Sequence, residues 1–475
     1  MLPTIATGNV ASALPTGYEV ANSCRFNYGD SAYLTRTFGS AGNQKTWTFS
    51  TWCKRSKFGA QQTLFGTSSA SDAYHLFYWG SDESLTHNFN GTVTNASSGA
   101  KFRDPSAWMH VVCAVDTTQG VAANRVKLYV NGVSVGSGNY PSENADMTLN
   151  SATRCDVGSS GAHYTSHMCG HYLAETVFID GTQYAASDFG EFDEDSPTIW
   201  KPKDVSGLTF GTNGFYLDYE DSANLGNDAN GGTDWTETNL AATDQATDTP
   251  TNNFATLNPL DHYYNATSNT GATSTEGNTK FVIASGNKGF ARSTIGVTAG
   301  KWYWECKLHA VSKGFLGICN SGAEAYNSTP QVHAVYIYEG VPDFRSGAQV
   351  LTTGVASIST DDIMNFALDM DNHAFYIGVN NSWMNSGDPT SGSSRTGAIS
   401  ELFTTGRAII SDSGEMFANL LNTSTSGGIN TSMNFGNPAY ANSSSVADAN
   451  GYGAFEFAPP TNYFALCTKN LAEYG

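Results

Sequence analysis

The sequence predicts an all-β protein built of two antiparallel β-sandwiches (jelly rolls) in tandem. Its 475 residues exceed the usual domain size of about 50–250 residues. Charged residues make up only 14% and glycine occupies 49 positions, a composition typical of short strands joined by turns. Short runs of alternating apolar and polar residues recur along the chain, whereas long helical periodicity is absent. We therefore expect a sandwich in each half.

Strand patterns are densest in the first half. The segment KTWTFSTWCKR, residues 45–55, alternates Trp47, Phe49 and Cys53 on one face with Trp52 on the other. The segments AWMHVVCAVD, RVKLYVNG and AETVFIDG show the same period. After residue 280 the strands resume, with GKWYWECKLHA, DIMNFALDMD and HAFYIGVNN.

The domain boundaries follow from changes in composition. Residues 222–279 are rich in Gly, Asn, Asp and Thr and poor in aliphatic residues, which predicts an extended connector. The expected organisation is an N-terminal arm (1–21), a first sandwich (22–221), this connector, and a second sandwich (280–475).

One strand-and-turn pattern occurs twice, as VKLYVNGVSV (126–135) and HAFYIGVNNSW (373–383). Asn131-Gly132 suits a two-residue type I′ turn, in which both positions need positive φ. Asn380-Asn381 takes that place in the second copy, since asparagine tolerates the left-handed region. We expect two related sandwiches, with Tyr129 and Tyr376 on matching strands.

Charge and hydropathy exclude several classes of function. The net charge of −20 repels a phosphate backbone, so no nucleic-acid partner is expected. No segment approaches the roughly 18 apolar residues of a membrane helix, so we expect no membrane insertion. The first twenty residues lack the basic and apolar regions of a signal peptide, which predicts a soluble protein without an N-terminal export signal.

The cysteines favour a structural role. None forms a CxxC pair, which argues against zinc. We expect buried, reduced thiols, although a Cys155–Cys169 disulfide stays open. The eight are Cys24, Cys53, Cys113, Cys155, Cys169, Cys306, Cys319 and Cys467.

Both halves resemble known families. The first resembles laminin G-like, concanavalin A-like jelly rolls on WTFSTWCKR, WMHVVCAVD, RVKLYVNGVSV and LAETVFIDG. The second resembles SPRY domains, which are also concanavalin A-like sandwiches, on GKWYWECKL, GFLGICN, DDIMNFALDMDNHAFYIGVNN and MNFGNPAY. Asn365 stands where the SPRY pattern has glycine.

The order of the modules and the connector resemble structural proteins of tailed bacteriophages of the marine type. This resemblance implies a non-enzymatic virion surface protein, a fibre, spike or decoration protein, assembled in the host bacterial cytoplasm. Its partners would be other virion proteins and a host surface glycan or envelope receptor, and a homotrimer stays open. The alternatives are a capsid decoration protein without a receptor and a polysaccharide-degrading glycosidase.

The SPRY resemblance also implies a binding surface in loops at one end of the second sandwich. On the matching positions these are Tyr338, Asp343, Phe344 and Arg345, together with Trp383 after the hairpin. Aromatic residues and arginine are the usual anchors of binding sites. The alternative is that these aromatic rings pack on their own domain.

Two acidic clusters are candidate sites. Glu191, Asp193 and Asp195 alternate as in glycosidases, whose paired carboxyls lie about 5–5.5 Å apart. Their flanks, Gly190 and Pro197, instead predict a solvated loop without catalysis. Calcium prefers such oxygen ligands. With no EF-hand spacing we expect solvated turns and no cofactor, leaving a calcium ion open at Asp218, Asp221, Asp228 and Asp234.

Overall fold

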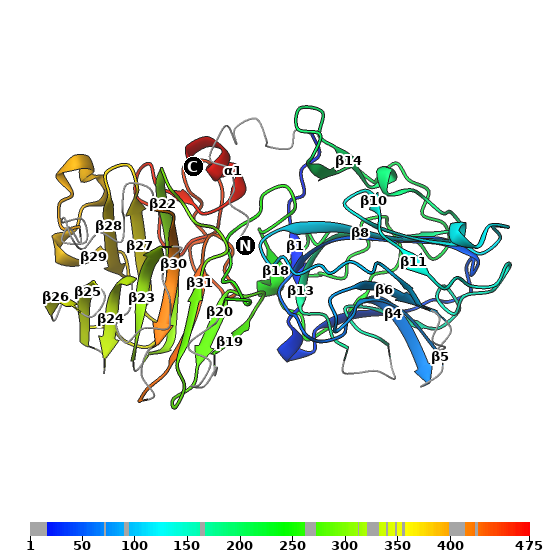
Figure 1. Cartoon of the computed structure of the whole chain (residues 1–475), viewed down its shortest axis with the longest axis horizontal. Helices are drawn as coiled ribbons and strands as arrows, with labels where there is room; N and C mark the ends of the chain where they lie inside the picture. The colour runs from blue at the N-terminus through cyan, green and yellow to red at the C-terminus, as the bar shows by residue number, and fades with distance from the viewer. Residues whose placement is uncertain are drawn as a thin grey trace. The chain divides into compact units, whose positions relative to one another are not determined.

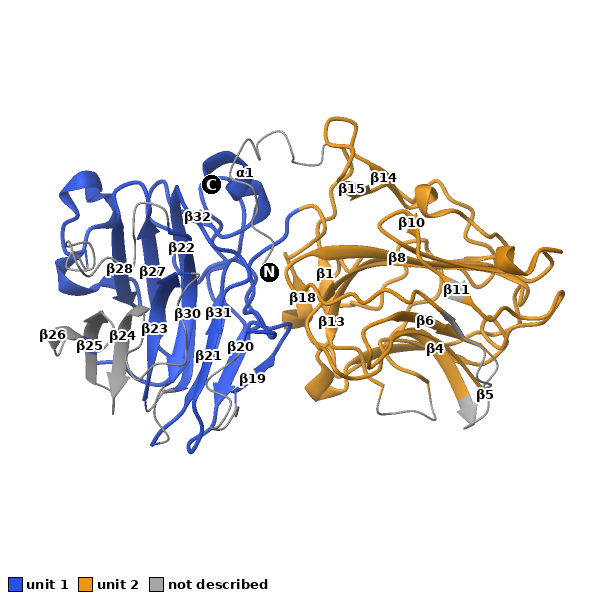
Figure 2. Ribbon diagram, viewed as in Figure 1, with its two compact units in different colours: residues 1–14, 252–475 blue, residues 15–251 orange. Residues whose placement is uncertain are grey.

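The structure is a computed structural model with two compact units (Figure 2). Residues 15–251 form one unit, called here the first sandwich, and the other, the second sandwich, contains residues 252–475. In the described part of the chain the one α-helix is α1 (Thr468–Tyr474), and no helix there is long and apolar enough to cross a membrane. The described residues are 17–70, 73–89, 95–161, 167–261, 272–311, 313–320, 332–338, 341–346, 349–353, 357–398, 414–422 and 426–475.

The first sandwich contains two antiparallel sheets (Figure 1). The β3 sheet has the order β10-β9-β8-β3-β13-β1-β18, with β16 also paired to β13. The β4 sheet has the order β11-β7-β6-β5-β4-β12-β2-β17. The strands of the β3 sheet are β1 (Ser23–Arg25), β3 (Thr46–Arg55), β8 (Trp108–Asp116), β9 (Val126–Val130), β10 (Val133–Ser134), β13 (His171–Asp180), β16 (Phe215–Leu217) and β18 (Gln245–Ala246). Those of the β4 sheet are β2 (Tyr33–Thr37), β4 (Gln62–Ala70), β5 (Ala73–Trp79), β6 (Leu85–Asn88), β7 (Asn95–Ser97), β11 (Ser137–Gly138), β12 (Arg154–Val157) and β17 (Thr236–Thr238).

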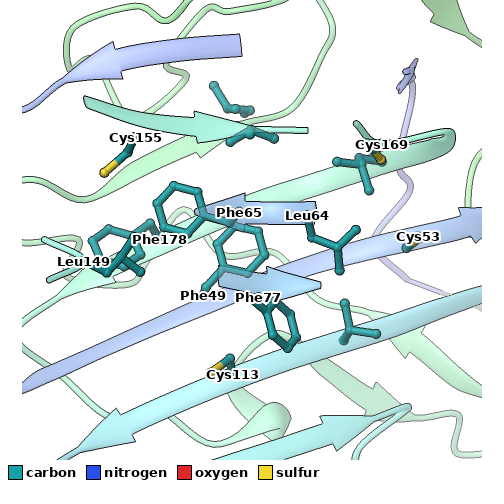
Figure 3. Close-up of a cluster of buried hydrophobic side chains, with 14 of the residues drawn as sticks. Phe49, Cys53, Leu64, Phe65, Phe77, Cys113, Leu149, Cys155, Cys169 and Phe178 are labelled. Atoms are coloured by element: carbon teal, nitrogen blue, oxygen red, sulfur yellow. The ribbon is translucent and has the colours of Figure 1, made fainter. Parts of the chain in front are cut away.

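Large apolar side chains fill the space between these two sheets (Figure 3). The ring of Phe49 on β3 stacks on that of Phe65 on β4, with ring centres 4.8 Å apart, and meets the ring of Phe77 edge-on at 5.8 Å. The strand period explains this core, because alternate residues of a strand point to the same face. All eight cysteines are buried and free, so the disulfide between Cys155 and Cys169 is not formed.

The outer face of the β3 sheet is also covered. Val112 and Val177 pack there against Phe189 and Phe210, which belong to the chain that follows β13. This segment includes a separate hairpin of β14 (Gly190–Phe192) and β15 (Trp200–Pro202).

Part of the predicted connector lies within the first sandwich. In residues 222–251, β17 pairs with β2, β18 pairs with β1, and Trp235 is buried in the core. The glycine- and asparagine-rich composition suggested a linker, but these short strands complete two sheet edges. The next residues belong to the second sandwich, where Leu257 is buried in the core.

The second sandwich also contains two sheets (Figure 1). The β22 sheet has the order β19-β20-β31-β22-β27-β28-β29, with β32 parallel to β22. The β23 sheet has the order β21-β30-β23-β24-β25-β26. The strands of the β22 sheet are β19 (Ala272–Thr275), β20 (Lys280–Ile283), β22 (Lys301–Val311), β27 (Ile363–Asp369), β28 (Ala374–Val379), β29 (Ser382–Trp383), β31 (Ile429–Asn434) and β32 (Phe464–Ala465). Those of the β23 sheet are β21 (Gly289–Arg292), β23 (Lys313–Asn320), β24 (Val332–Tyr338), β25 (Val341–Ser346), β26 (Gln349–Thr353) and β30 (Met416–Asn422).

The two predicted hairpins occupy matching places. Val130 pairs with Val133 around the first turn and Val379 pairs with Ser382 around the second. Each hairpin ends its sheet, as β10-β9-β8-β3 in the first and β29-β28-β27-β22 in the second. Tyr129 on β9 and Tyr376 on β28 therefore lie on matching strands, as predicted.

Candidate functional site

The binding residues predicted in the second sandwich lie mainly on strands. Tyr338 ends β24, and Asp343, Phe344 and Arg345 lie within β25. Tyr338 pairs with Val341, so the predicted loop is a strand pair, which the apolar alternation of VYIY and VPDF could have signalled. Asp343 is half-buried, while the side chains of the other three predicted residues lie outside the described part.

Trp383 packs on its own domain. It lies within the hairpin, opposite Gly378, and its half-buried ring meets that of Tyr376 edge-on at 6.5 Å. Its strand belongs to the β22 sheet, whereas β24 and β25 belong to the β23 sheet. Trp383 and the other predicted residues therefore come from different sheets of the second sandwich.

The acidic segment 191–195 is a turn of defined geometry rather than a solvated loop. Asp193 is buried, and its carboxylate accepts hydrogen bonds from the backbone N–H groups of Asp195 and Ser196. The ammonium of Lys201 lies 3.1 Å from Asp193 and 3.8 Å from Glu191. The prediction of a solvated loop is therefore wrong for Asp193, whose carboxylate stabilises the turn between β14 and β15.

The candidate calcium ligands are engaged in local hydrogen bonds, and Oδ1 of Asp234 accepts the backbone N–H of Asp228 at 3.1 Å. Asp228 is buried beside Arg36, and its carboxylate accepts the N–H of Tyr216. The carboxylates of Asp218 and Asp221 each accept a backbone N–H two residues ahead. Among the described residues no group of three or more His, Cys, Asp or Glu is placed to hold a metal ion.

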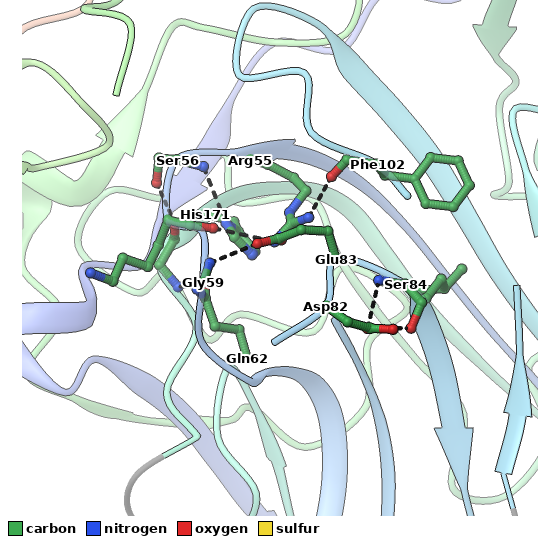
Figure 4. Close-up of polar contacts among 12 residues, drawn as sticks. Arg55, Ser56, Gly59, Gln62, Asp82, Glu83, Ser84, Phe102 and His171 are labelled. Carbon is green, nitrogen blue, oxygen red and sulfur yellow. Dashed lines mark hydrogen bonds and ion pairs between the residues drawn. The ribbon is translucent and has the colours of Figure 1, made fainter. Parts of the chain in front are cut away.

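A different polar cluster lies at one end of the first sandwich (Figure 4). Its centre is Arg55, the last residue of β3, which is fully buried. Its guanidinium lies 2.7 Å from the carboxylate of Glu83 and donates to the carbonyl of Phe102 at 2.5 Å. The same guanidinium lies between the rings of Phe58 and Trp79, 4.7 and 4.6 Å from their centres. We call this group, with Ser56, Gln62 and His171, the rim cluster.

His171 begins β13 directly opposite Arg55. The N–H of Ser56 donates to its Nδ1 at 3.2 Å, which places the ring proton on Nε2. Burial and the Arg55 charge hold the pKa of His171 well below its usual value, so the ring is neutral. The Oε1 atom of Gln62 accepts the N–H of Gly170 at 3.1 Å.

Three buried donors of the rim cluster have no hydrogen-bond partner among the described residues. They are Nε of Arg55, Nε2 of Gln62 and Nε2 of His171. Buried polar groups are normally satisfied by protein, water or a ligand. The rim cluster is therefore a set of N–H donors suited to an oxygen-rich partner, held in place by an ion pair.

Side chains at the surface adjoin this buried base. The Lys57 ammonium lies 5.3 Å from the ring centre of Tyr28, and the Tyr28 side chain is exposed. Phe58, which covers Arg55, is half-buried. An exposed ring and a half-buried ring beside a charged group are the composition of a small-molecule or glycan-binding surface.

A second unusual group is Glu175, at a bulge in β13 where its φ is 49°. Its Oε2 accepts hydrogen bonds from the hydroxyls of Tyr216 at 2.8 Å and Tyr18 at 3.1 Å, and these hydroxyls lie 3.0 Å apart. Burial raises the pKa of Glu175 to about 7. Above pH 7 the carboxylate accepts from both hydroxyls. Below pH 7 the protonated carboxyl donates to one hydroxyl in place of accepting from it, so that three hydrogens serve the three contacts and the group is a neutral anchor for Tyr18.

The sequence did carry one signal for the rim cluster. Trp47, Phe49, Cys53 and Arg55 share the period of one strand face, so Arg55 continues an inward-pointing apolar series. A buried cation requires a partner. The pattern does not identify that partner, because Glu83 and His171 come from distant parts of the chain.

A family model supports the fold of the first sandwich. Residues 27–169 match the family model described as the concanavalin A-like lectin/glucanases superfamily. No curated protein matches the chain. Among solved structures, the SPRY domain of human HERC1 is 18% identical, covering 33% of this chain and 87% of its own, with a TM-score of 0.25.

Two further solved structures are similar at low identity. A protein of Bacteroides ovatus described as carbohydrate-binding is 14% identical, covering 46% of this chain and 59% of its own, with a TM-score of 0.34. Domains LG4-5 of the mouse laminin α1 chain are 10% identical, covering 85% of this chain and 83% of their own, with a TM-score of 0.29. The family match and the two antiparallel sheets together show that the chain contains a lectin-like jelly-roll domain.

Proposed function

We propose that this chain is a non-enzymatic carbohydrate-binding protein, and that the surface above the rim cluster contacts the glycan. One observation carries the proposal: Lys57 lies against the exposed ring of Tyr28, and the ring of Phe58 covers Arg55, in a cluster with three buried N–H donors that have no partner among the described residues. An aromatic ring packs against the apolar face of a sugar, and a charged group at the surface, here Lys57, holds its oxygens. The lectin-like family match over residues 27–169 agrees with this role.

Mutation of the two rings tests the proposal. Binding of the full chain to immobilised host-surface polysaccharide would be measured for the wild type and for Tyr28→Ala/Phe58→Ala. Two lost anchors should weaken binding roughly 10- to 30-fold, since each typically contributes more than about 1 kcal/mol. Phe192→Ala, which removes an exposed ring in the β14–β15 hairpin, is the control and should bind like the wild type. Unchanged binding in the double variant, with an unchanged melting temperature, would overturn the proposal.

The biological setting is part of the same proposal. The resemblance of the module order to tailed-bacteriophage structural proteins favours a virion surface protein, a fibre, spike or decoration protein that docks on other virion proteins and attaches to the host. Antibody labelling of particles tests this placement. Loss of adsorption by particles carrying Tyr28→Ala/Phe58→Ala would support attachment, whereas normal adsorption would favour a decoration protein without a receptor. Sedimentation of the isolated chain distinguishes a homotrimer from a monomer.

A further inference from the structure

A row of cationic side chains crosses the outer face of the β22 sheet. Ser432 on β31 lies directly opposite Lys280 on β20 and directly opposite Lys307 on β22. Residues directly opposite each other in an antiparallel sheet project to the same face. The two lysines are therefore separated by one strand, about 10 Å from backbone to backbone. Their long side chains can converge above the small Ser432.

His309 joins this row through a bulge in β22 between Leu308 and Ala310. Its Nε2 lies 2.8 Å from the hydroxyl of Ser432. The pKa of His309 is lowered, first by partial burial and then by the charges of Lys280 and Lys307, while Asp361 acts in the opposite direction. The three basic groups are thus close enough to affect one another.

In the described part of the chain the one acid found to act on this row is Asp361, through the pKa of His309. Within the described residues neither Lys280 nor Lys307 forms an ion pair, although the chain has 43 acidic and 23 basic residues. The ammonium of Lys307 instead lies 5.3 Å from the ring centre of Tyr440. A local excess of positive charge on such an acidic chain indicates a surface for an anionic group.

A shallow depression of about 370 Å³ lies next to this row. Next to the row, Asn430 on β31 lies opposite both Val282 on β20 and Ala310 on β22. These three residues line the depression together with Thr360. Val282 is half-buried and Ala310 is exposed, whereas Oδ1 of Asn430 is buried without a partner among the described residues. The depression therefore offers an apolar surface beside two ammonium groups.

We propose that this end of the β22 sheet binds an acidic sugar, a ring that carries a carboxylate or a sulfate. Lys280 and Lys307 would hold the anion, and Val282 and Ala310 would contact the apolar face of the ring. The net charge of −20 opposes a long polyanion, but beyond about 8 Å that field is screened at physiological salt. A short acidic glycan segment fits both constraints. The site lies in the second sandwich and stands whether or not the rim cluster binds a glycan.

Calorimetric titration with defined oligosaccharides tests the site. The probes are a galacturonate hexamer, its neutral methyl ester, and a sulfated galactose hexamer. The full chain should bind at least one acidic probe and bind the ester at least ten-fold more weakly. Lys280→Gln/Lys307→Gln should lose at least ten-fold in affinity, while Lys127→Gln/Lys203→Gln, the same charge change in the first sandwich, should lose less than two-fold. The proposal is overturned if no acidic probe binds, if the ester binds equally well, or if both double variants behave alike.

A spectroscopic readout distinguishes direct binding from a general charge effect. The histidine ring proton signal of His309, assigned by its loss in His309→Asn, reports the pKa of that ring. The positive charges of the two lysines lower this pKa, and a bound anion offsets them. The pKa should therefore rise in the presence of the acidic probe and stay unchanged with the ester. An unchanged pKa at saturating acidic probe would place the ligand elsewhere. Tyr28→Ala/Phe58→Ala should keep this response, which separates failure at this site from failure at the rim cluster.

Discussion

The hairpin of β9 and β10 and the hairpin of β28 and β29 can be compared contact by contact. Their turn residues all have positive φ: 48° and 77° at Asn131 and Gly132, and 47° and 64° at Asn380 and Asn381. In each, the first asparagine binds the neighbouring strand. Oδ1 of Asn131 accepts the N–H of His110 at 2.8 Å, and Oδ1 of Asn380 accepts that of Ile363 at 3.0 Å. One asparagine thus fixes both the turn and the adjacent strand.

The second turn position differs because its surroundings differ. A Cβ on Gly132 would lie 2.4 Å from the ring of Trp200, whose indole donates to Nδ1 of His110 at 3.1 Å. Asn381 is exposed, and its N–H donates to Oδ1 of Asn365 at 2.8 Å. Asn365, which stands where the SPRY pattern has glycine, therefore stabilises this turn by accepting a hydrogen bond from its backbone. The comparison teaches that local chemistry selects the first residue, while tertiary packing selects the second.

Buried carboxylates are stabilised in two ways. Asp248 pairs with the Lys54 ammonium at 2.5 Å, and Glu83 pairs with Arg55. Glu305 instead accepts the hydroxyl of Tyr303 at 2.9 Å and the backbone N–H groups of Glu456 and Phe457 at 2.9 and 2.8 Å. Both sandwiches use both ways, since tyrosine hydroxyls hold Glu175 in the first and Lys301 pairs with Asp369 in the second.

The largest expected effect is the loss of stability of the first sandwich in acid. Burial lowers the pKa of His75, His87, His110 and His171, to about 3 for His87 and His110. The unfolded chain binds these protons below about pH 6.5, so stability should fall as pH drops from 6.5 toward 3. The loss is about 1.4 kcal/mol per histidine at pH 5.5. Urea unfolding at pH 7.5, 6.5 and 5.5 measures it.

Glu175 acts in the opposite direction, because its raised pKa makes stability fall as pH rises from about 4.5 to about 7. One glutamate does not offset four histidines at pH 5.5. His75→Phe/His87→Phe should remove about half of the acid sensitivity. A first sandwich whose stability does not change between pH 6.5 and 5.5 would contradict the neutral, buried histidines.

Breaking a buried charge pair should have the second-largest effect on stability. Lys54→Met leaves Asp248 buried without its cation and should cost about 3–5 kcal/mol. Lys54→Met/Asp248→Leu removes both charges and should cost less than the single change. Denaturant unfolding of the two variants checks this order, and the reverse order would show that the buried Asp248 carboxylate does not need its cation.

Exchanging the second turn residue should have a smaller effect. Gly132→Asn places a side chain against Trp200 and should destabilise the first sandwich by about 2–3 kcal/mol. Asn381→Gly, the matching change in the second hairpin, should alter stability by less than about 0.5 kcal/mol. Thermal unfolding measures both. If Trp200→Ala does not reduce the cost of Gly132→Asn, contact with the ring is not its cause.

The smallest effect concerns the shared asparagine. Asn131→Ala and Asn380→Ala should each cost about 1–2 kcal/mol, since alanine loses the hydrogen bond and disfavours positive φ. Asn131→Gly and Asn380→Gly keep the backbone freedom and should cost less. Unequal losses at the two positions, by more than about 1 kcal/mol in the same assay, would show that the hairpins are not equivalent.

The strands and both hairpins could be predicted because their signals are local, as in the period of Trp47, Phe49 and Cys53. The rim cluster could not, since Arg55 meets partners whose positions depend on the sheet order. The composition of residues 222–251 predicts a connector, because composition does not show that Trp235 is buried or that Asp248 has a partner. The SPRY resemblance predicts a loop at YEGVPDFRSG, although the alternation of this segment fits β25.

The central claim is that the chain binds glycan without cleaving it. The most direct measurement incubates the full chain with host-surface polysaccharide and follows both bound protein and newly formed reducing ends. We expect saturable binding, weakened by Tyr28→Ala/Phe58→Ala, with no rise in reducing ends over the same period. Absence of binding would contradict the claim, and so would release of reducing ends that Glu191→Gln abolishes.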